Sequence, residues 1–428
     1  YAGEHIGGAL WQYFEGQGDA ERALAAMKDA SRYTRGHLSR DAVHALYGGA
    51  VTLSASRMDM ARSCHFAYFM RYGLKARERT GAGFDAPQIG TFVHDVMEHT
   101  LRQAKECGGL HTLSKDKLHA LVRASIEEYI DRVLPDLSEK SARFRYLFNR
   151  LCATVERIMD EVSEELQSSD FEPLAFELEF GADGQLPAIT IREENGTARV
   201  VGKVDRVDGW LHDGKLYLRV VDYKTGKKSF DLAELRYGLG LQMLLYLFTL
   251  KEEGQMLFGG HEIVPAGVLY TPAREPMLRC ARDTEPEKIE KALKKELRRS
   301  GMVLEDPAVL QAMEHSAIES PCYLPIAVKR DGAVTGSLAS AEQLGKLSKY
   351  VDHILHEITQ EVFAGNIDAD PYARTPQQSA CTYCEFASAC HFENGCGSDR
   401  MEYIKATKND EFWQYIDEVN GEGAHENG

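Results

Sequence analysis

Asp205, Asp222 and Lys224 are the residues of this sequence whose types and spacing best suit chemistry. They lie in two runs rich in Val, Leu and aromatic residues, which is typical of strands, on either side of Asp213-Gly214. Asp-Gly is a strong signal for a two-residue hairpin turn. Across such a turn the numbers of facing residues sum to 427, as 205 and 222 do. The sequence therefore predicts that the two aspartates face each other, with Cβ atoms roughly 5 Å apart.

This pair of carboxylates has a chemical consequence. Opposed like charges destabilise a sheet, and a divalent cation between them removes the repulsion. Carboxylate oxygens suit Mg²⁺ or Mn²⁺. Lys224, two residues after Asp222, projects from the same face, where it could orient or help deprotonate a water and stabilise charge on a phosphate. The spacing alone leaves a surface hairpin with solvated charges as an equal alternative.

A second set of candidate ligands is the run CTYCEFASAC, which places Cys381, Cys384 and Cys390 within ten residues. A closed tetrahedral site needs four ligands, and the spacing fits zinc as well as an iron–sulfur cluster. Cys396 is a nearby candidate for the fourth ligand. The isolated cysteines are expected to be structural thiols: Cys107, Cys152, Cys280 and Cys322.

Composition sets the context for both sites. The 428 residues, 43% hydrophobic and 27% charged, indicate a soluble globular protein of two or three domains, and the absence of an apolar run of about 18 residues predicts no membrane span. A net charge of −16 argues mildly against a surface coated with phosphate-binding residues, although a local basic groove is compatible with it. Nine cysteines without a secretion signal favour a reducing compartment, which we expect to be the cytoplasm. The chain lacks an initiator Met, and we expect it to be part of a longer protein.

Hydrophobic periodicity predicts an α/β fold in which helices flank one mixed sheet. Residues 4–47 and 54–166 have helical patterns, and residues 232–250 predict one long, mostly buried helix. Beyond residue 285 the chain is expected to be mainly helical until the cysteines. Gly238-Leu239-Gly240 is too short a glycine pattern to indicate anything by itself. Strands are predicted at residues 171–180, 198–210, 215–224 and 261–272.

With these residues in hand, the run GKVDRVDGW followed by VVDYKTGKK resembles the core of RecB-like nucleases of the PD-(D/E)XK superfamily. Further marks of that family occur in its order: GTxxH at residues 90–94, QxxxY at 242–246, PAGVLY at 265–270, and the cysteines. The resemblance covers residues 53–392. LSASRMDMARSCHFAYFMRYGL is similar to the start of the nuclease domain in AddB subunits of AddAB helicase–nucleases.

The resemblance implies a restriction-endonuclease-like core and roles for particular residues. His94, Asp205, Asp222 and the Tyr223 carbonyl would hold Mg²⁺ (or Mn²⁺), and Lys224 would assist the attacking water. Gln242 and Tyr246, one helical turn apart, would position Lys224 or the DNA backbone. Glu177 and Glu179 could add a carboxylate, although alternating charge along a strand explains them as well.

The resemblance also implies a [4Fe–4S] cluster held by Cys64, Cys381, Cys384 and Cys390. His65 replaces the usual proline after the first of these cysteines. Such a cluster would act as a clasp between the two ends of the nuclease domain. The expected division is a helical extension at residues 1–50, a nuclease domain at 51–400 with its hairpin core at 170–275, and an acidic tail at 401–428.

By the same resemblance, the expected function is hydrolysis of DNA by a metal-dependent, exonuclease-type deoxyribonuclease. It would act on a single-stranded end delivered by an AddA-like helicase–nuclease subunit, in double-strand break repair and recombination. Two alternatives stay open. One is a catalytically inactive iron–sulfur subunit for DNA binding or docking, and the other is a stand-alone RecB-like exonuclease.

Overall fold

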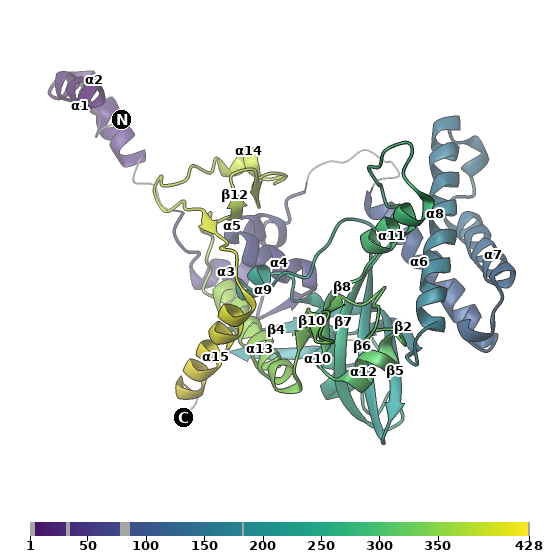
Figure 1. Cartoon of the computed structure of the whole chain (residues 1–428). Coiled ribbons are helices and arrows are strands. Elements are labelled where there is room, and N and C mark those ends of the chain that lie inside the picture. The colour runs from purple at the N-terminus through teal and green to yellow at the C-terminus, as the bar shows by residue number, and fades with distance from the viewer. Residues whose placement is uncertain (1–4, 31–34, 78–85, 182–183, 427–428) are drawn as a thin grey trace.

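The computed structural model describes residues 5–30, 35–77, 86–181 and 184–426 and arranges them around a six-stranded mixed sheet (Figure 1). The strands lie in the order β11-β8-β7-β6-β5-β2. Neighbours pair antiparallel except β6 with β7 and β8 with β11, which are parallel. The bounds are β2 Glu172–Phe180, β5 Gly202–His212, β6 Lys215–Lys224, β7 Glu262–Pro272, β8 Ser300–Leu304 and β11 Leu338–Ala339.

The hairpin of β5 and β6 has the register that the sequence predicts. Its pairs run from His212 with Lys215 to Arg206 with Val221, so the ladder stops one residue before the two aspartates. Asp213 and Gly214 both have positive φ, 49° and 78°. This is the backbone of a type I′ turn, whose twist matches that of the strands.

Helices cover both faces of this sheet. On the face of Asp222 lies α10 (Gln242–Glu253), whose residues from Met243 to Leu250 are all buried. On the opposite face lies α8 (Ala142–Gln167), and α6 (Ala86–Glu106) and α7 (Lys115–Val133) pack beside it, at the right of Figure 1. Short 3-10 turns link these helices at Leu110–Thr112 and Leu137–Glu139. Two further helices flank β8, α11 (Pro286–Glu296) and α12 (Pro307–Met313).

Smaller sheets surround the central one. A three-stranded sheet has the order β1-β4-β3, a two-stranded sheet joins β9 and β10, and another three-stranded sheet has the order β13-β12-β14. α13 (Ala341–Phe363), which begins with a capping box at Ser340 and Gln343, packs on β3 and β4. The bounds are β1 Ala50–Leu53, β3 Ile189–Glu193, β4 Gly196–Val200, β9 Ile326–Val328, β10 Val334–Gly336, β12 Tyr372–Thr375, β13 Gln378–Ser379 and β14 Glu402–Tyr403.

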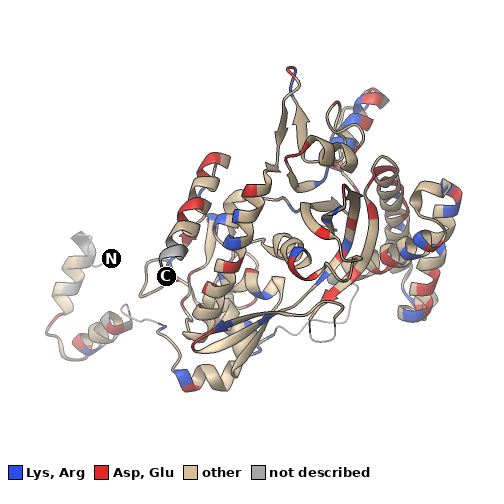
Figure 2. Cartoon of the chain, turned by 90° about the horizontal axis from the view of Figure 1, so that it is seen from below, with Lys and Arg blue, Asp and Glu red and all other residues tan. Residues whose placement is uncertain are grey.

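The two ends of the described chain are helical. α1 (His5–Phe14) and α2 (Gly18–Ala30) project from the body of the molecule, as Figures 1 and 2 both show. α15 (Asn409–Glu426) packs on α13 and buries Phe412, Trp413 and Ile416. The remaining helical elements are α3 Arg40–Tyr47, α4 Ala55–Ser63, α5 His65–Tyr68, a π-helical turn Phe69–Gly73, α9 Leu232–Arg236 and α14 Ala387–Cys390. The division into extension, nuclease domain and tail stays a prediction, and residues 1–4, 31–34, 78–85, 182–183 and 427–428 of it lie outside the described residues.

Several expectations about elements are wrong. The described residues form four sheets rather than one, and strands β8 to β14 occur beyond residue 285. The predicted strand 198–210 is divided at Val201, whose N–H donates to the Leu53 carbonyl, so β4 and β5 enter different sheets. The predicted helix 232–250 is interrupted between α9 and α10, because Gly238 and Gly240 have φ of 73° and 67°. These left-handed conformations end a helix.

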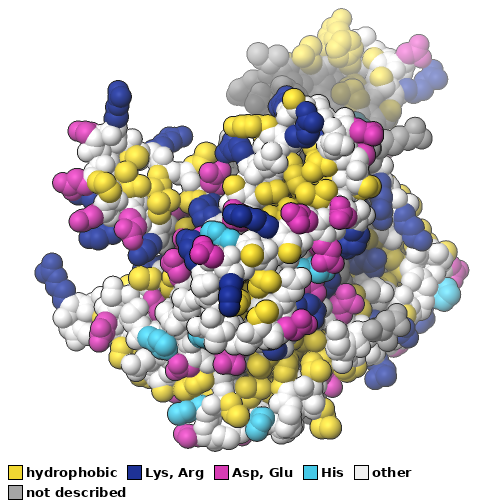
Figure 3. Space-filling view, turned by 90° about the vertical axis from the view of Figure 1, so that its right-hand side faces the viewer, with side chains coloured by type: hydrophobic (Ala, Val, Ile, Leu, Met, Phe, Trp, Pro, Cys, Tyr) yellow, Lys and Arg dark blue, Asp and Glu magenta, His cyan; other side chains and the backbone are white. Residues whose placement is uncertain are grey.

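The surface carries mixed charge. On the face shown in Figure 3, basic side chains are interspersed with acidic ones, in keeping with the moderate net charge per residue. None of the helices in the described parts of the chain is long and apolar enough to cross a membrane.

Candidate functional site

The ends of β5 and β6 bring together three of the predicted site residues. The Tyr223 N–H donates to Asp205 Oδ2 at 2.8 Å, and the Tyr223 carbonyl oxygen lies 3.0 Å from His94 Nε2. The other ring nitrogen of His94, Nδ1, is 3.4 Å from Asp205 Oδ1. Helix α6 thus places His94 against the hairpin, as the GTxxH motif predicts.

Glu177 on β2 completes a group of possible metal ligands with His94 and Asp205. One ligand atom from each of the three lies within 4.8 Å of the others. The pairs of β2 with β5, Phe176 with Arg206 and Leu178 with Val204, leave Glu177 opposite Asp205. Glu177 has a φ of 48°, a strained conformation that is often found at functional sites. The sequence made Glu177 and Glu179 equal candidates for an additional carboxylate ligand. The strand register distinguishes them, because it places Glu177 opposite Asp205 and pairs Glu179 with Lys203.

Asp222 lies beside this group and has partners of its own. Its Oδ2 is 2.7 Å from Lys224 Nζ, and its Oδ1 accepts a hydrogen bond from Gln242 Nε2 at 3.4 Å. Gln242 Nε2 also lies within 3.2 Å of the Tyr246 hydroxyl. In the structure, Gln242 of the QxxxY pair therefore contacts Asp222, whereas the expectation from the sequence was that the pair positions Lys224 or the DNA backbone.

The site carries an excess of negative charge, which the pKa values of its groups reflect. Burial alone would lower the pKa of His94, but Asp205, Asp222 and Glu177 together raise it to about 9. Burial, and then the charge of Asp205, raise the pKa of Asp222 to about 6 despite the ion pair with Lys224. A potential that holds a proton on His94 equally favours a divalent cation, whose binding would displace that proton. The donor set of carboxylates, an imidazole and a carbonyl fits such an ion.

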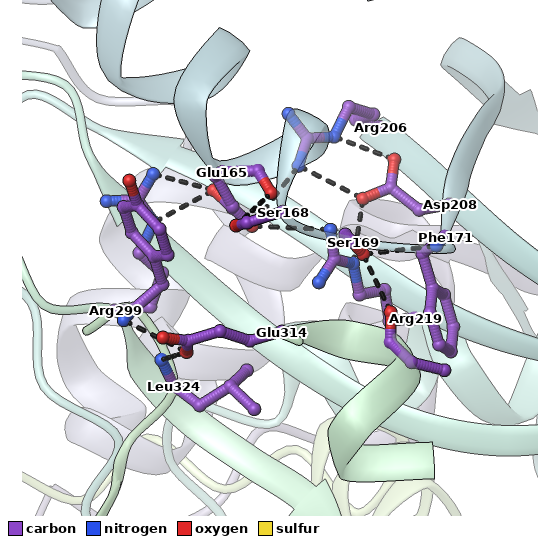
Figure 4. A network of polar contacts seen from close by, with 12 residues as sticks. Glu165, Ser168, Ser169, Phe171, Arg206, Asp208, Arg219, Arg299, Glu314 and Leu324 are labelled. Atoms are coloured by element: carbon purple, nitrogen blue, oxygen red, sulfur yellow. Dashed lines mark hydrogen bonds and ion pairs between the residues drawn. The ribbon is translucent and has the colours of Figure 1, made fainter. Parts of the chain in front are cut away.

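The surface-hairpin alternative is wrong, because Arg206 is fully buried and Asp222 is 3% exposed. Arg206 belongs to a charged network on the opposite face of the sheet, shown in Figure 4. Its Nε lies 2.8 Å from Asp208 Oδ1, and its Nη1 donates to the Tyr223 hydroxyl at 2.7 Å. Three arginines surround two carboxylates in this network: Arg206, Arg219, Arg299, Glu165 and Asp208. Tyr223 therefore connects the two faces of the hairpin.

The four cysteines of the expected cluster line one cavity of about 650 Å³. Cys64 is the C-cap of α4, and Cys381, Cys384 and Cys390 come from the segment around α14. Cys396 is not among the residues that line the cavity. Burial raises the pKa of the Cys64 thiol to about 12, so its thiolate needs a bound cation to form at neutral pH.

The spacing of the thiols bears on the kind of metal group that fits. In the described parts of the chain, no three cysteine sulfurs lie within 4.8 Å of one another. Four thiolates around one zinc ion would be about 3.8 Å apart, since each Zn–S bond is about 2.3 Å. The four thiols are therefore not arranged in this structure as they would be around a single zinc ion.

Bonds between protein groups also hold the cysteine segment. Arg35 Nη2 donates to the Cys390 carbonyl at 2.8 Å, and Arg35 forms an ion pair of 2.9 Å with Asp399. Arg71 pairs with Glu385 at 2.9 Å. Residues from the first fifth of the chain therefore contact the segment that follows residue 380.

The sequence model of the PD-(D/E)XK nuclease superfamily matches residues 52–391 of the chain, so the chain belongs to this superfamily. Among individual proteins, the chain is similar to the B subunits of the ATP-dependent helicase/deoxyribonucleases of three bacteria. Identity is 30% over 422 residues for Ruminiclostridium cellulolyticum (96% of this chain, 36% of the relative), 32% over 412 residues for Acetivibrio thermocellus (95% and 35%), and 31% over 383 residues for a Thermoanaerobacter species (88% and 33%). The chain spans about a third of the length of these relatives. The family resemblance seen in the sequence is thereby confirmed.

Proposed function

We propose that this chain is a deoxyribonuclease domain that hydrolyses phosphodiester bonds of single-stranded DNA. The observation that carries the proposal is the convergence of His94, Glu177, Asp205, Asp222 and Lys224 from four elements on one side of the hairpin. An acidic group of this kind next to a lysine suits metal-assisted attack of water on a phosphate. The names of the relatives support the same activity.

Particular residues have particular roles in this proposal. His94, Asp205, Asp222 and the Tyr223 carbonyl would hold Mg²⁺ (or Mn²⁺), and the position of Glu177 adds it to this set. When bound, the ion supplies Lewis-acid polarisation of the phosphate and lowers the pKa of water. Lys224 Nζ orients the attacking water and stabilises negative charge at the phosphorus, because Asp222 holds it at 2.7 Å. Gln242 and Tyr246 fix the Asp222 carboxylate through the hydrogen bonds described above.

The test is a nuclease assay on labelled single-stranded DNA with Mg²⁺, with and without chelator. We expect Asp222→Ala and Lys224→Ala each to lower the rate by at least about a thousandfold, with the thermal unfolding transition retained. Matched controls lie at the other end of the same hairpin: Asp213→Asn in the turn and Lys215→Ala, which pairs with Glu262 on the surface. Normal cutting by the Asp222 and Lys224 variants would refute this active site, whereas a wild-type chain that cuts no DNA in the presence of Mg²⁺ would favour the inactive docking subunit. A substrate with a single labelled end distinguishes exonucleolytic from internal cutting.

We also propose that Cys64, Cys381, Cys384 and Cys390 hold a [4Fe–4S] cluster with a structural role. The shared cavity supports Cys64 over Cys396 as the fourth ligand. A cluster there would close a long loop of chain, which stabilises the folded state. The purified protein should be brown and contain iron. We expect Cys64→Ala to lose the visible absorbance and to unfold at a lower temperature, and Cys396→Ala to retain both. The reverse result would move the fourth ligand to Cys396, and a colourless zinc protein would exclude the cluster.

The partner in this proposal is an AddA-like helicase–nuclease subunit. It delivers a DNA end during double-strand break repair and recombination, and we place this activity in the cytoplasm. Support comes from the relatives, whose names describe one subunit of an ATP-dependent helicase/deoxyribonuclease. Co-purification of the full-length protein with an ATP-dependent helicase would be the expected result. A full-length protein that degrades DNA ends alone and at the same rate would instead favour the stand-alone exonuclease.

A further inference from the structure

Helix α4 lines the cysteine cavity and also contacts the loop that leads into the active-site helix α10. Cys64 is the C-cap of this helix, and the helix residues Asp59 and Met60 line the cavity together with that cysteine. The same Asp59 accepts, through Oδ1, a hydrogen bond from the Gly240 N–H at 2.9 Å. This bond joins residues that are 181 positions apart in the sequence.

Gly240 belongs to the loop that interrupts the helix predicted at residues 232–250. Because φ is 67° at Gly240, the chain there is not helical, and its N–H needs an acceptor outside α10. Asp59 supplies this acceptor. Arg62, one turn further along α4, packs so closely on Gly238 that a Cβ at this position would lie 2.7 Å from Arg62 Nε. Helix α4 therefore shapes the loop with two side chains.

The loop in turn sets the start of α10. Gln242 is the first residue of α10 and follows Gly240 by two positions. The N-cap of α10, Leu241, has no side chain able to cap the helix, so the preceding loop defines where the helix begins. Gln242 then reaches Asp222 Oδ1 and the Tyr246 hydroxyl. A shift of the loop would thus move Gln242 relative to Asp222.

We propose that Asp59 is a positioning residue that couples the order of the cysteine cavity to the placement of Gln242 beside Asp222. The inference deepens the proposed function, since it takes the cysteine cavity and Asp222 as the two sites described above. When the cavity is filled, Cys64 fixes the end of α4, Asp59 holds the Gly240 N–H, and the first turn of α10 stays in place. When the cavity is empty, α4 loosens, and Gln242 loses its fixed position although no residue of the active site has changed.

Hydrogen–deuterium exchange of the Gly240 amide measures this coupling directly and needs no cutting activity. The full chain is compared with iron and sulfide reconstituted and after their removal. In the wild type, we expect exchange at residue 240 to be about tenfold slower in the iron-loaded protein. In Asp59→Ala, exchange should be fast in both states, whereas Asp59→Asn, which retains an acceptor oxygen, should behave as the wild type. Arg57→Ala is the control, because Arg57 on the same helix donates to the Thr52 carbonyl and not to the loop.

Kinetics give a second readout. Asp59→Ala should lower kcat roughly tenfold with little change in KM, at unchanged iron content, and Asp59→Asn should restore kcat. Equal exchange at Gly240 with and without iron overturns the coupling, as does an Asp59→Ala protein that exchanges as slowly as the wild type. Failure of the proposed function would be visible separately, as a wild-type protein that cuts no DNA.

Discussion

Asp205 and Arg206 are neighbours in the sequence, yet their side chains lie in opposite electrostatic surroundings. On the Asp205 face of the hairpin, three carboxylates crowd around one histidine and one lysine, and the pKa values of His94 and Asp222 are raised. On the Arg206 face, Arg206, Arg219 and Arg299 surround Glu165 and Asp208, and all five are buried. A bound cation would stabilise the acidic face, whereas the Arg206 face already carries three cationic side chains around its two carboxylates.

This difference in charge indicates that the Asp205 face binds ligands, whereas the Arg206 face stabilises the fold around them. The network on the Arg206 face supports the site from beneath, because Arg206 holds the hydroxyl of Tyr223 while the backbone of Tyr223 contacts Asp205 and His94. A buried charge network of this kind fixes side-chain positions, and its disruption costs more than the loss of one exposed pair. Substitutions on the two faces should therefore differ in the sign of their effect on stability.

The largest effect on stability is expected for Asp208→Asn. Asp208 is fully buried and pairs with Arg206 at 2.8 Å and with Arg219 at 2.9 Å. Removing its charge leaves two buried guanidinium groups poorly compensated, which should lower the free energy of unfolding by about 3–5 kcal/mol in a denaturant titration. Asp213→Asn, at a turn position whose side chain is 89% exposed, should change it by less than about 0.5 kcal/mol. Equal, small effects of the two variants would show that the buried network contributes little.

The second prediction concerns the loss of folding stability at low pH that Glu165 causes. Burial alone would raise the pKa of Glu165, but Arg299, Arg219 and Arg206 lower it to about 2. Because the folded value lies below the unfolded one, Glu165 stabilises the fold above pH 4.5, and this contribution is lost as the pH falls toward 2. The loss should approach about 3 kcal/mol. Glu165→Gln should be less stable than the wild type at pH 7 and should show a smaller decline between pH 5 and pH 2. Parallel curves for the two proteins would contradict the assignment.

The sequence predicted the parts of the site that depend on local signals. The Asp-Gly turn set the register of β5 and β6, and that register placed Asp205 and Asp222 at the same end of the hairpin. The GTxxH and QxxxY patterns located His94 and Gln242 because the order of family motifs carried information about distant contacts. These roles remain proposals, but the structure does bring the residues together.

What the sequence missed depends on contacts between distant segments. Spacing alone allows Arg206 to be a solvated charge, since nothing local shows that Arg219, on the next strand, and Glu165, on α8, meet at this position. The hydrophobic pattern predicts a helix through Gly238 and Gly240 because the pattern continues across both glycines. The left-handed conformations of the two glycines end the helix, and the contacts with Asp59 and Arg62 that accompany them come from a distant part of the sequence.

The smallest expected effect is also the one with the opposite sign. Asp222 has a folded pKa of about 6, above its ordinary value of 3.8, so its ionised form destabilises the metal-free fold above pH 6. Asp222→Asn should therefore unfold at a slightly higher denaturant concentration than the wild type at pH 8 with chelator. The gain should be no more than about 3 kcal/mol, a limit in which the opposing ion pair with Lys224 is already included, and it should vanish below pH 4. Added Mg²⁺ should reverse the order, since a ligand that binds only the folded wild type stabilises that protein alone. If Asp222→Asn instead destabilises the metal-free protein as Asp208→Asn does, the two faces of the hairpin do not differ in the way proposed, and the acidic face is a scaffold as well.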